Sequence, residues 1–428
     1  MEIPSKPIQL QDGAEEALRI VRRLQEAGFI AYFAGGCVRD ALLKRNPKDY
    51  DVATNATPDS VREVFGKSKT LSYGVSFGVI GVLPDRRSRK HEVSHATEVA
   101  TFRSDGDYSD GRRPDSVQFG DPEEDALRRD FTINGLFYDP IANQVIDYVG
   151  GKADLESQIL RTIGDPQARF GEDRLRMLRA IRFSASLGFR IEASTEQAIT
   201  RHAQAMDVVS EERIGAEMRR VLVAPFVMDG LISLVKTELA KSVIPQLMGI
   251  DLHLLSKRVL ASKSDDFRFR LAAMISMFHD PSQAILDLTK RWRLSNEEVR
   301  TLSTSLRYFA QLLDFQNLPW SQTQPIMVNR DIEFIVDLAA VISASGTALQ
   351  RTRSREVLGR VQEVLKWKED QLDPKPLLSG DDLRSLGFTP GPEFARVLKR
   401  IRALQLDGEL NSKEQAIERA IEAFKKSS

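Results

Sequence analysis

Two aspartates one residue apart, Asp49 and Asp51, are the clearest candidates for chemistry in this 428-residue sequence. They lie in KDYDVAT, where the apolar residues predict a strand, and alternation along the chain would place both carboxylates on the same side. Adjacent carboxylates repel each other unless a cation lies between them, and hard oxygen ligands at this spacing favour Mg²⁺. Metal ions held here could activate an attacking hydroxyl and neutralise a leaving pyrophosphate. We expect a third carboxylate from a neighbouring strand, with Glu98 as the candidate and Glu92 as the alternative.

A glycine pair upstream of these aspartates could bind phosphate. Gly35 and Gly36 end the apolar run FIAYFA and precede the helical pattern ALLKR, which predicts a strand-to-helix turn. Glycines let backbone N–H groups approach an anion closely, and Arg39 can donate two hydrogen bonds to phosphate oxygens. A glycine pair alone is more often structural, but its position just before two aspartates favours a metal-and-phosphate site.

Two further groups of polar residues suit a nucleotide. Arg129, Asp130 and Asn134, in RRDFTIN, carry a donor, an acceptor and an amide within one turn and suit a ribose, although a capped turn is the structural alternative. Downstream, Asp173 and Arg176 are three residues apart in a segment with helical periodicity, so we expect them on one face of a helix. The same face continues with two arginines that could contact phosphates or stabilise a helix bundle: Arg179 and Arg182.

The elements around these residues form a mixed part followed by a helical part. Apolar spacing predicts a helix over 14–27, and the strand predictions are 29–34, 75–83, 97–102 and 144–149. From about residue 151 the strand patterns fade, and apolar residues recur every three to four positions. We therefore expect an α+β fold with a mixed sheet in 1–150 and all-helical segments over 151–225, 226–372 and 373–428.

Five motifs in this order resemble those of the class II tRNA nucleotidyltransferases, which include CCA-adding enzymes and bacterial poly(A) polymerases. The first is GGCVRD with KDYD, and the second is RRDFTIN at 128–134. The others are DYVGG at 147–151 leading to Asp154-Leu155, EDRLRMLRA at 172–180 and SEERIGAE at 210–217. The resemblance covers nearly the whole chain.

This resemblance implies a nucleotidyltransferase head, a helical neck that selects the nucleotide, and a helical body and tail that bind RNA. It implies that the RRD motif contacts the ribose 2′-OH, and that Asp173 and Arg176 together imitate a Watson–Crick edge to choose C or A without a template. The loop 104–115 is similar to the element needed for adding A, and the basic segment 85–96 is longer than usual. Residues 377–410 resemble the tRNA-binding tail, with a helix N-terminus near residue 392 followed by Lys399, Arg400 and Arg402; a plain helical cap is the alternative.

Composition agrees with a protein that has local basic surfaces. The formal net charge is +0, but arginines gather in several clusters between residues 86 and 182. Because there is one cysteine, Cys37, neither an internal disulfide nor a multi-cysteine metal site is expected, and we interpret Cys37 and the His279-Asp280 pair as structural. The N-terminal residues lack a signal-peptide pattern and no long apolar run is present, so we expect no membrane partner and a cytoplasmic location.

The expected reaction is therefore Mg²⁺-dependent transfer of nucleotides from CTP and ATP to the 3′ end of tRNA. The alternatives from other classes are an RNA-binding protein without catalysis and a nucleotide-sensing regulator, and the intact carboxylates disfavour both. Within the enzyme class, the shared motifs leave the product open among CCA, a terminal A, two cytidines and a poly(A) tail.

Overall fold

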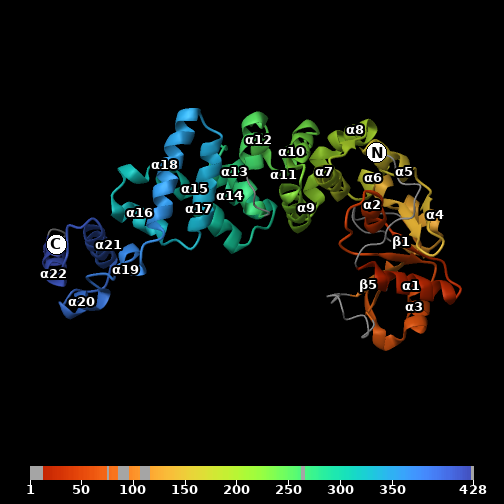
Figure 1. Ribbon diagram of the computed structural model, residues 1–428, viewed down its shortest axis with the longest axis horizontal. Helices are drawn as coiled ribbons and strands as arrows, with labels where there is room; N and C mark the ends of the chain where they lie inside the picture. Colours follow the sequence, from red (N-terminus) through yellow and green to blue (C-terminus); the bar gives the residue numbers. More distant parts are fainter. Residues whose placement is uncertain (1–12, 75–76, 85–95, 107–115, 262–265, 426–428) are drawn as a thin grey trace. The chain divides into compact units, whose positions relative to one another are not determined.

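The computed structural model describes residues 13–74, 77–84, 96–106, 116–261 and 266–425 (Figure 1). The chain forms two compact units, residues 1–248 and 249–428. The first contains the predicted head and neck, and the second is helical. The boundary between the two units falls after residue 248. The division into four segments, with a boundary near residue 225, stays a prediction.

A seven-stranded sheet forms the base of the first unit (Figure 1). Its strands are β3 (Thr70–Gly74), β4 (Val79–Val82), β5 (Thr97–Thr101), β2 (Val52–Thr54), β1 (Ala31–Ala34), β8 (Leu136–Asp139) and β9 (Gln144–Asp147), in spatial order. Only the pair β2 and β5 is parallel, so the sheet is mixed as expected. The predicted strands at 29–34, 75–83, 97–102 and 144–149 correspond to β1, β4, β5 and β9.

Helices cover the sheet because its side chains alternate between two apolar faces. The predicted first helix is α1 (Ala14–Glu26), which buries Ile20, Val21 and Leu24 and packs against β1 and β2. A separate cluster on the sheet joins Phe102 and Phe137 to Ala126 of α4 (Pro122–Leu127). The two phenylalanine rings meet edge to face, with their centroids 5.7 Å apart. The short strands β6 (Arg103–Asp105) and β7 (Val117–Phe119) form a hairpin beside α4.

The rest of the first unit is a helical neck around one nearly enclosed helix. This helix, α7 (Leu175–Leu187), packs against α9 (Glu211–Val223) and α10 (Val227–Lys236). The surrounding helices are α5 (Gly151–Ser157), α6 (Pro166–Glu172), α8 (Ala193–His202) and α11 (Ala240–Val243). The expectation that no strand occurs after residue 151 is wrong in one detail, because Ile159–Leu160 (β10) and Arg190–Ile191 (β11) form a parallel pair. These strands are two residues long, too short for a period-2 pattern to reveal.

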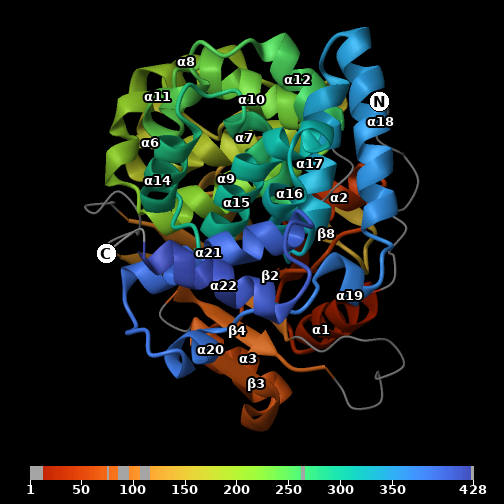
Figure 2. The same ribbon diagram turned by 90° about the vertical axis from the view of Figure 1, so that its left-hand side faces the viewer.

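The second unit is built from helices with separate apolar clusters. Its first part comprises α12 (Leu252–Ala261), α13 (Phe267–Ile275), α14 (Pro281–Arg291), α15 (Asn296–Leu313), α16 (Trp320–Met327), α17 (Ile332–Ala344), α18 (Ala348–Val364) and α19 (Glu369–Leu372). One cluster lies between α15 and α18, and another joins α20 (Gly380–Ser385), α21 (Pro392–Leu406) and α22 (Lys413–Lys425). Figure 2 shows α21 and α22 side by side. As predicted, α21 begins at Pro392.

The interpretation of the His279-Asp280 pair as structural agrees with its contacts. Asp280 is the N-cap of α14 and accepts a hydrogen bond from the Gln283 backbone N–H at 2.9 Å. An aspartate in this position satisfies a helix-terminal donor, which is a folding role rather than a chemical one.

Substitution of Phe102 tests how much its contact with Phe137 stabilises the head. Its side chain is fully buried, so Phe102→Ala should lower the free energy of unfolding by about 3–5 kcal/mol through lost burial and a residual cavity. Urea-induced unfolding of the full chain measures this change. The matched control is Phe119→Ala, because Phe119 is 52% exposed and its loss should cost only about 0.5 kcal/mol. Equal losses in the two variants would contradict this assignment of the core.

Candidate active site

An arginine-rich cavity of about 550 Å³ lies in the first unit, between the glycine turn and helix α7. Its charged lining residues are eight arginines and four aspartates, an excess of positive charge that suits a triphosphate. The lining contains all ten predicted nucleotide-binding residues: Gly35, Gly36, Arg39, Arg129, Asp130, Asn134, Asp173, Arg176, Arg179 and Arg182. Thus residues far apart in the sequence meet at one site.

The predicted strand-to-helix turn is present at the floor of this cavity. Strand β1 ends at Ala34, and α2 (Gly36–Leu42) begins two residues later. Gly35 has φ of 70°, which favours glycine, and its N–H donates to the Leu136 carbonyl oxygen at 3.0 Å. A Cβ atom at this position would lie 2.8 Å from Nη1 of Arg129. The absence of a side chain therefore lets the turn and that arginine approach closely.

The predicted catalytic carboxylates gather where β2 and β5 begin. Both aspartates precede strand β2, which starts at Val52. Tyr50, between them, is buried against Phe33, whereas Asp49 and Asp51 are exposed. The two carboxylates therefore face away from the core. Because Val52 pairs with Val99 in the parallel register, Asp51 and Glu98 precede directly paired residues. Glu98 is therefore the neighbouring carboxylate. The alternative, Glu92, lies outside the described residues.

Electrostatics around Asp51 indicate a place for a cation. Asp51 is solvent-accessible, but it lines a cavity whose surrounding protein partly desolvates its carboxylate. This desolvation, together with repulsion from Glu98 and Asp49, raises the pKa of Asp51 to about 6 against the attraction of Arg129. The cavity lining includes Asp51 but neither Asp49 nor Glu98. Among the described residues, no three His, Cys, Asp or Glu side chains converge into a complete metal site. Mg²⁺ commonly takes one or two carboxylates together with substrate phosphates, so this donor set fits such an ion when a nucleotide is present.

Asp130 holds the residues predicted to contact the ribose. Its Oδ2 accepts from Nε and Nη2 of Arg179 at 2.8 and 2.6 Å, and its Oδ1 accepts from Nδ2 of Asn134 at 3.0 Å. Oδ1 of Asn134 in turn accepts from Nη1 of Arg39 at 2.7 Å. Despite desolvation, Arg179 and the hydrogen bonds lower the pKa of Asp130 to about 2. Asp130 is therefore ionised at neutral pH and connects the glycine turn, the RRD motif and α7.

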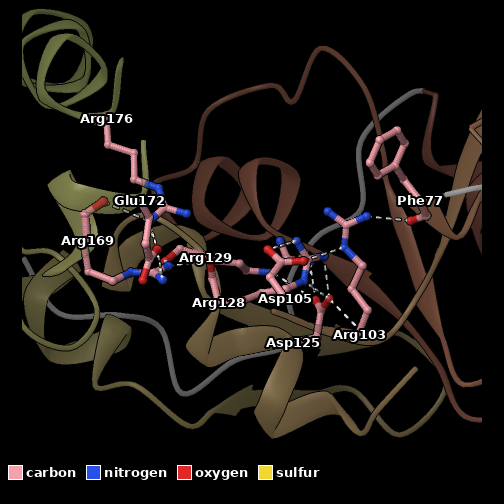
Figure 3. A network of polar contacts seen from close by, with 9 residues as sticks. All are labelled: Phe77, Arg103, Asp105, Asp125, Arg128, Arg129, Arg169, Glu172 and Arg176. Atoms are coloured by element: carbon pink, nitrogen blue, oxygen red, sulfur yellow. Dashed lines mark hydrogen bonds and ion pairs between the residues drawn. The ribbon is translucent and has the colours of Figure 1, made fainter. Parts of the chain in front are cut away.

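A second buried carboxylate, Asp125, holds the arginine pair of the same motif (Figure 3). Its Oδ1 accepts from Nε and Nη2 of Arg128 at 2.8 and 2.6 Å, and its Oδ2 accepts from Nε and Nη2 of Arg129 at 3.1 and 2.8 Å. Arg128 also lies 3.9 Å from Asp105 of the β6–β7 hairpin. A single carboxylate thus holds two consecutive arginines at the cavity wall.

The predicted arrangement of Asp173 and Arg176 on one helix face is wrong. Asp173 is the C-cap of α6 and has extended backbone angles, and α7 begins only at Leu175. Oδ1 of Asp173 accepts the Leu175 N–H at 3.0 Å, so the aspartate caps the helix instead of entering it. Both residues nevertheless line the cavity, where Asp173 also accepts from Nη2 of Arg213 at 2.8 Å.

Arg179 and Arg182 share a face of α7, as predicted, and lie near the ring of Phe183. The guanidinium carbons of Arg39, Arg179 and Arg182 are 5.2, 5.5 and 4.1 Å from the centroid of this ring. Nε of Arg182 is 2.7 Å from Oε2 of the buried Glu217. Burial lowers the pKa of Arg182 to about 10, which still leaves it charged at neutral pH.

Sequence reasoning did not assign several lining residues to the site: Arg103, Asp105, Arg128, Leu175, Phe183 and Arg213. Arg128 and Arg213 do occur in quoted motifs, so the order of motifs could have indicated them. Asp105 lies in the segment 104–115 that the resemblance indicated, whereas Arg103 carries no such signal and reaches the cavity through a short hairpin. The predicted loop 104–115 and basic segment 85–96 fall largely outside the described residues.

Cys37 has the structural role expected of it. Its thiol is buried and donates to the Ala34 carbonyl oxygen at 3.3 Å. Burial and the nearby Asp51 charge raise the pKa of Cys37 to about 12, so the reactive thiolate is absent at neutral pH.

Comparisons with known proteins agree with this geometry along the whole chain. Family models match in order: "Poly A polymerase head domain" over residues 31–161, "Probable RNA and SrmB- binding site of polymerase A" over 188–250, and "tRNA nucleotidyltransferase domain 2 putative" over 270–421. CCA-adding enzymes of Streptococcus thermophilus and Lactobacillus helveticus are both 32% identical, covering 96% and 97% of this chain and 97% and 98% of their own. The chain belongs to the family of CCA-adding enzymes.

Solved structures show the same relationship. The Bacillus stearothermophilus CCA-adding enzyme in complex with CTP superposes with a TM-score of 0.70 at 28% identity, covering 97% of this chain and all of that one. The Thermotoga maritima CCA-adding enzyme complexed with tRNA has a TM-score of 0.63 at 19% identity, covers 98% of this chain and 99% of its own, and shares the fold. The protein is therefore a nucleotidyltransferase, a class whose phosphoryl transfer generally uses divalent metal ions. Within the described residues, no helix is long and apolar enough to cross a membrane.

Gly35 provides a test of the turn beneath the cavity. Gly35→Ala forces a Cβ atom against Arg129 and should weaken CTP binding by about tenfold or more, measured by isothermal titration calorimetry. The matched control is Gly66→Ala, which has similar backbone strain, with φ of 87°, but has nothing within 4 Å of the added atom. Both variants should lose about 1 kcal/mol of stability. Unchanged CTP affinity in Gly35→Ala would contradict the proposed role of the turn.

Proposed function

We propose that this chain adds C, C and A in order to the 3′ end of tRNA, using CTP and ATP without a nucleic-acid template. The observation that carries this proposal is an arginine-rich cavity lined by Asp51, with Glu98 preceding the paired strand position, in a member of this family. We place the reaction in the cytoplasm, which agrees with a single buried cysteine and no disulfide.

Asp49 and Asp51 would bind Mg²⁺, with Glu98 as the third carboxylate beside them. When bound, Mg²⁺ supplies activation of the tRNA 3′-hydroxyl and neutralises charge on the leaving pyrophosphate. The raised pKa of Asp51 agrees with this assignment, because desolvation and then repulsion from Glu98 and Asp49 outweigh the attraction of Arg129. Such an arrangement is costly in the free protein and is relieved by the ion.

The cavity arginines would bind the triphosphate and the sugar. Gly36 contributes the backbone of the α2 start, and Arg39 lies beside it with its guanidinium already held by Asn134. Asp130 and Asn134 are close enough to share hydrogen bonds with a ribose 2′-OH, with Arg129 next to them. Because these side chains are held before a nucleotide arrives, little conformational entropy is lost on binding.

Nucleotide selection would rest on Asp173 and Arg176. An aspartate accepts and an arginine donates hydrogen bonds, so the two can pair with the edge of C or A. Each has a protein partner in the cavity, Arg213 for Asp173 and Glu172 for Arg176, which fixes the direction of its remaining groups. Selection by fixed side chains explains how an enzyme could prefer a base without a template strand.

The tail would bind tRNA through basic residues in the middle of α21. Lys399 and Arg400 are exposed on this helix, whereas Arg402 forms an ion pair with Asp373 at 2.7 Å. Exposed cations on one helix suit sequence-independent contacts with phosphates. Arg402 is instead engaged in holding the helix to the preceding linker.

The test uses purified protein, Mg²⁺ and tRNAs that end at the discriminator base, at C or at CC, with CTP, ATP or both, and products resolved by single nucleotides. Ordered addition of C, C and A followed by arrest is expected. Asp51→Asn should reduce incorporation by about 10³-fold or more while tRNA binding persists, and the exposed Asp59→Asn should leave the rate unchanged. A single A on the CC end only, or long A tails on any RNA, would instead identify an A-adding enzyme or a poly(A) polymerase.

Asp51 also predicts a dependence on pH at limiting metal concentration. Its raised pKa of about 6 means that the carboxyl is neutral below that pH and cannot attract a cation. Incorporation at limiting Mg²⁺ should therefore fall as the pH drops through about 6. At saturating Mg²⁺ the midpoint should move to lower pH, because a bound cation favours the ionised form. A rate that is flat between pH 5 and 7 at limiting Mg²⁺ would contradict this assignment.

A further inference from the structure

Arg169, which has no assigned role in the account above, lies where contacts of the head meet those of the neck (Figure 3). We propose that Arg169 is a positioning residue for nucleotide selection, which fixes Arg176 relative to the turn that carries Arg128 and Arg129. The inference rests on the proposed role of Arg176 in reading the base. Arg169 belongs to α6, and its side chain is only 11% exposed.

On the head side, Arg169 contacts the main chain of the arginine pair. Its Nη2 donates to the Arg129 carbonyl oxygen at 2.5 Å and also to the Arg128 carbonyl oxygen. These carbonyls directly follow Leu127, the last residue of α4, where a helix has its partial negative charge. The guanidinium of Arg169 therefore stabilises the end of α4 and fixes the backbone from which two cavity arginines project.

On the neck side, the same guanidinium shares a carboxylate with Arg176. Nη1 of Arg169 and Nη1 of Arg176 each donate to Oε2 of Glu172 at 2.5 Å. Nη1 of Arg176 also donates to the carbonyl oxygen of Arg169 at 3.2 Å. Both the side chain and the main chain of Arg169 thus determine where the Arg176 guanidinium lies.

The shape of arginine is essential to this arrangement. A guanidinium is a planar fork that can contact two carbonyls through one nitrogen and a carboxylate through another. Lysine in its place would retain the positive charge but not the planar fork. Glutamine would remove the charge, so that of these two arginines only Arg176 would still pair with Glu172. In either variant Arg176 should sample more positions relative to the bound base, which would lower discrimination between CTP and ATP before it affects folding.

The experiment compares kcat/KM for CTP and ATP on tRNA ending at the discriminator base and at CC. Arg169→Gln should lower the preference for the correct nucleotide by about tenfold or more at both ends, and Arg169→Lys should restore it only in part. The control is Arg190→Ala, an exposed arginine on β11, which should keep the wild-type preference. If Arg169 acts through Arg176, Arg169→Gln combined with Arg176→Gln should lose no more preference than Arg176→Gln alone.

The inference is overturned if Arg169→Gln keeps the wild-type preference while Arg176→Gln loses it, or if the two losses multiply in the double variant. A purely structural role would lower the melting temperature and both rates equally with the preference unchanged, which also overturns it. If Arg169→Gln fails to fold by circular dichroism, Arg169→Lys provides the same comparison. Failure of the proposed function is distinct, because it would appear as no incorporation by the wild-type chain or as an unchanged preference in Arg176→Gln.

Discussion

The ion pair between Asp130 and Arg179 is the interaction on which the nucleotide site depends. Asp130 follows the arginine pair of the head, and Arg179 projects from the central neck helix α7, so one buried carboxylate connects two parts of the first unit. The same carboxylate holds Asn134, which holds Arg39 beside the glycine turn. Removing one partner of a buried, hydrogen-bonded pair typically costs about 3–5 kcal/mol, because the other charge stays buried.

A concentration of positive charge requires such carboxylates. Eight arginines line the cavity, and at ordinary separations in a partly desolvated site their mutual repulsion would drive the side chains apart. Carboxylates oppose this: the buried Asp125 and Glu217 each contact two arginines, and the partly exposed Glu172 contacts two more. The remaining positive excess is available to a triphosphate. The cavity is thus shaped for an anion before the anion binds, which limits the entropy lost on binding.

Local patterns in the sequence predicted the parts of this site that depend on local structure. The strand, glycine turn and helix from Ala31 to Leu42 follow from an apolar run, two glycines and a helical pattern, and the parallel register of β2 and β5 places Glu98 beside Asp51 as expected. The position of Asp173 was mistaken because helical periodicity continues through residues 172–188, whereas its carboxylate caps the next helix. Periodicity reports which residues can share a face and does not show where one helix ends and another begins.

Contacts between distant segments could not be predicted in this way. Arg169 donates hydrogen bonds to the carbonyl oxygens of residues 128 and 129. Every residue has a main-chain carbonyl, so the sequence does not indicate which ones accept such a bond. Arg103 and Asp105 reach the cavity through a three-residue strand of a hairpin that has no clear sequence pattern. Family resemblance indicated which residues act together, and the fold supplies the partners that hold them in place.

The most direct test of this account is the affinity for CTP of Asp130→Asn, measured by calorimetry beside the exposed control Asp59→Asn. Charge counting alone predicts tighter binding, because the substitution removes a negative charge from a cavity that receives a triphosphate. If Asp130 positions Arg39 and Arg179, binding should instead weaken by about tenfold or more, with the control unchanged. Equal or tighter binding by a variant with the wild-type melting temperature would contradict the claim that buried carboxylates prearrange this site.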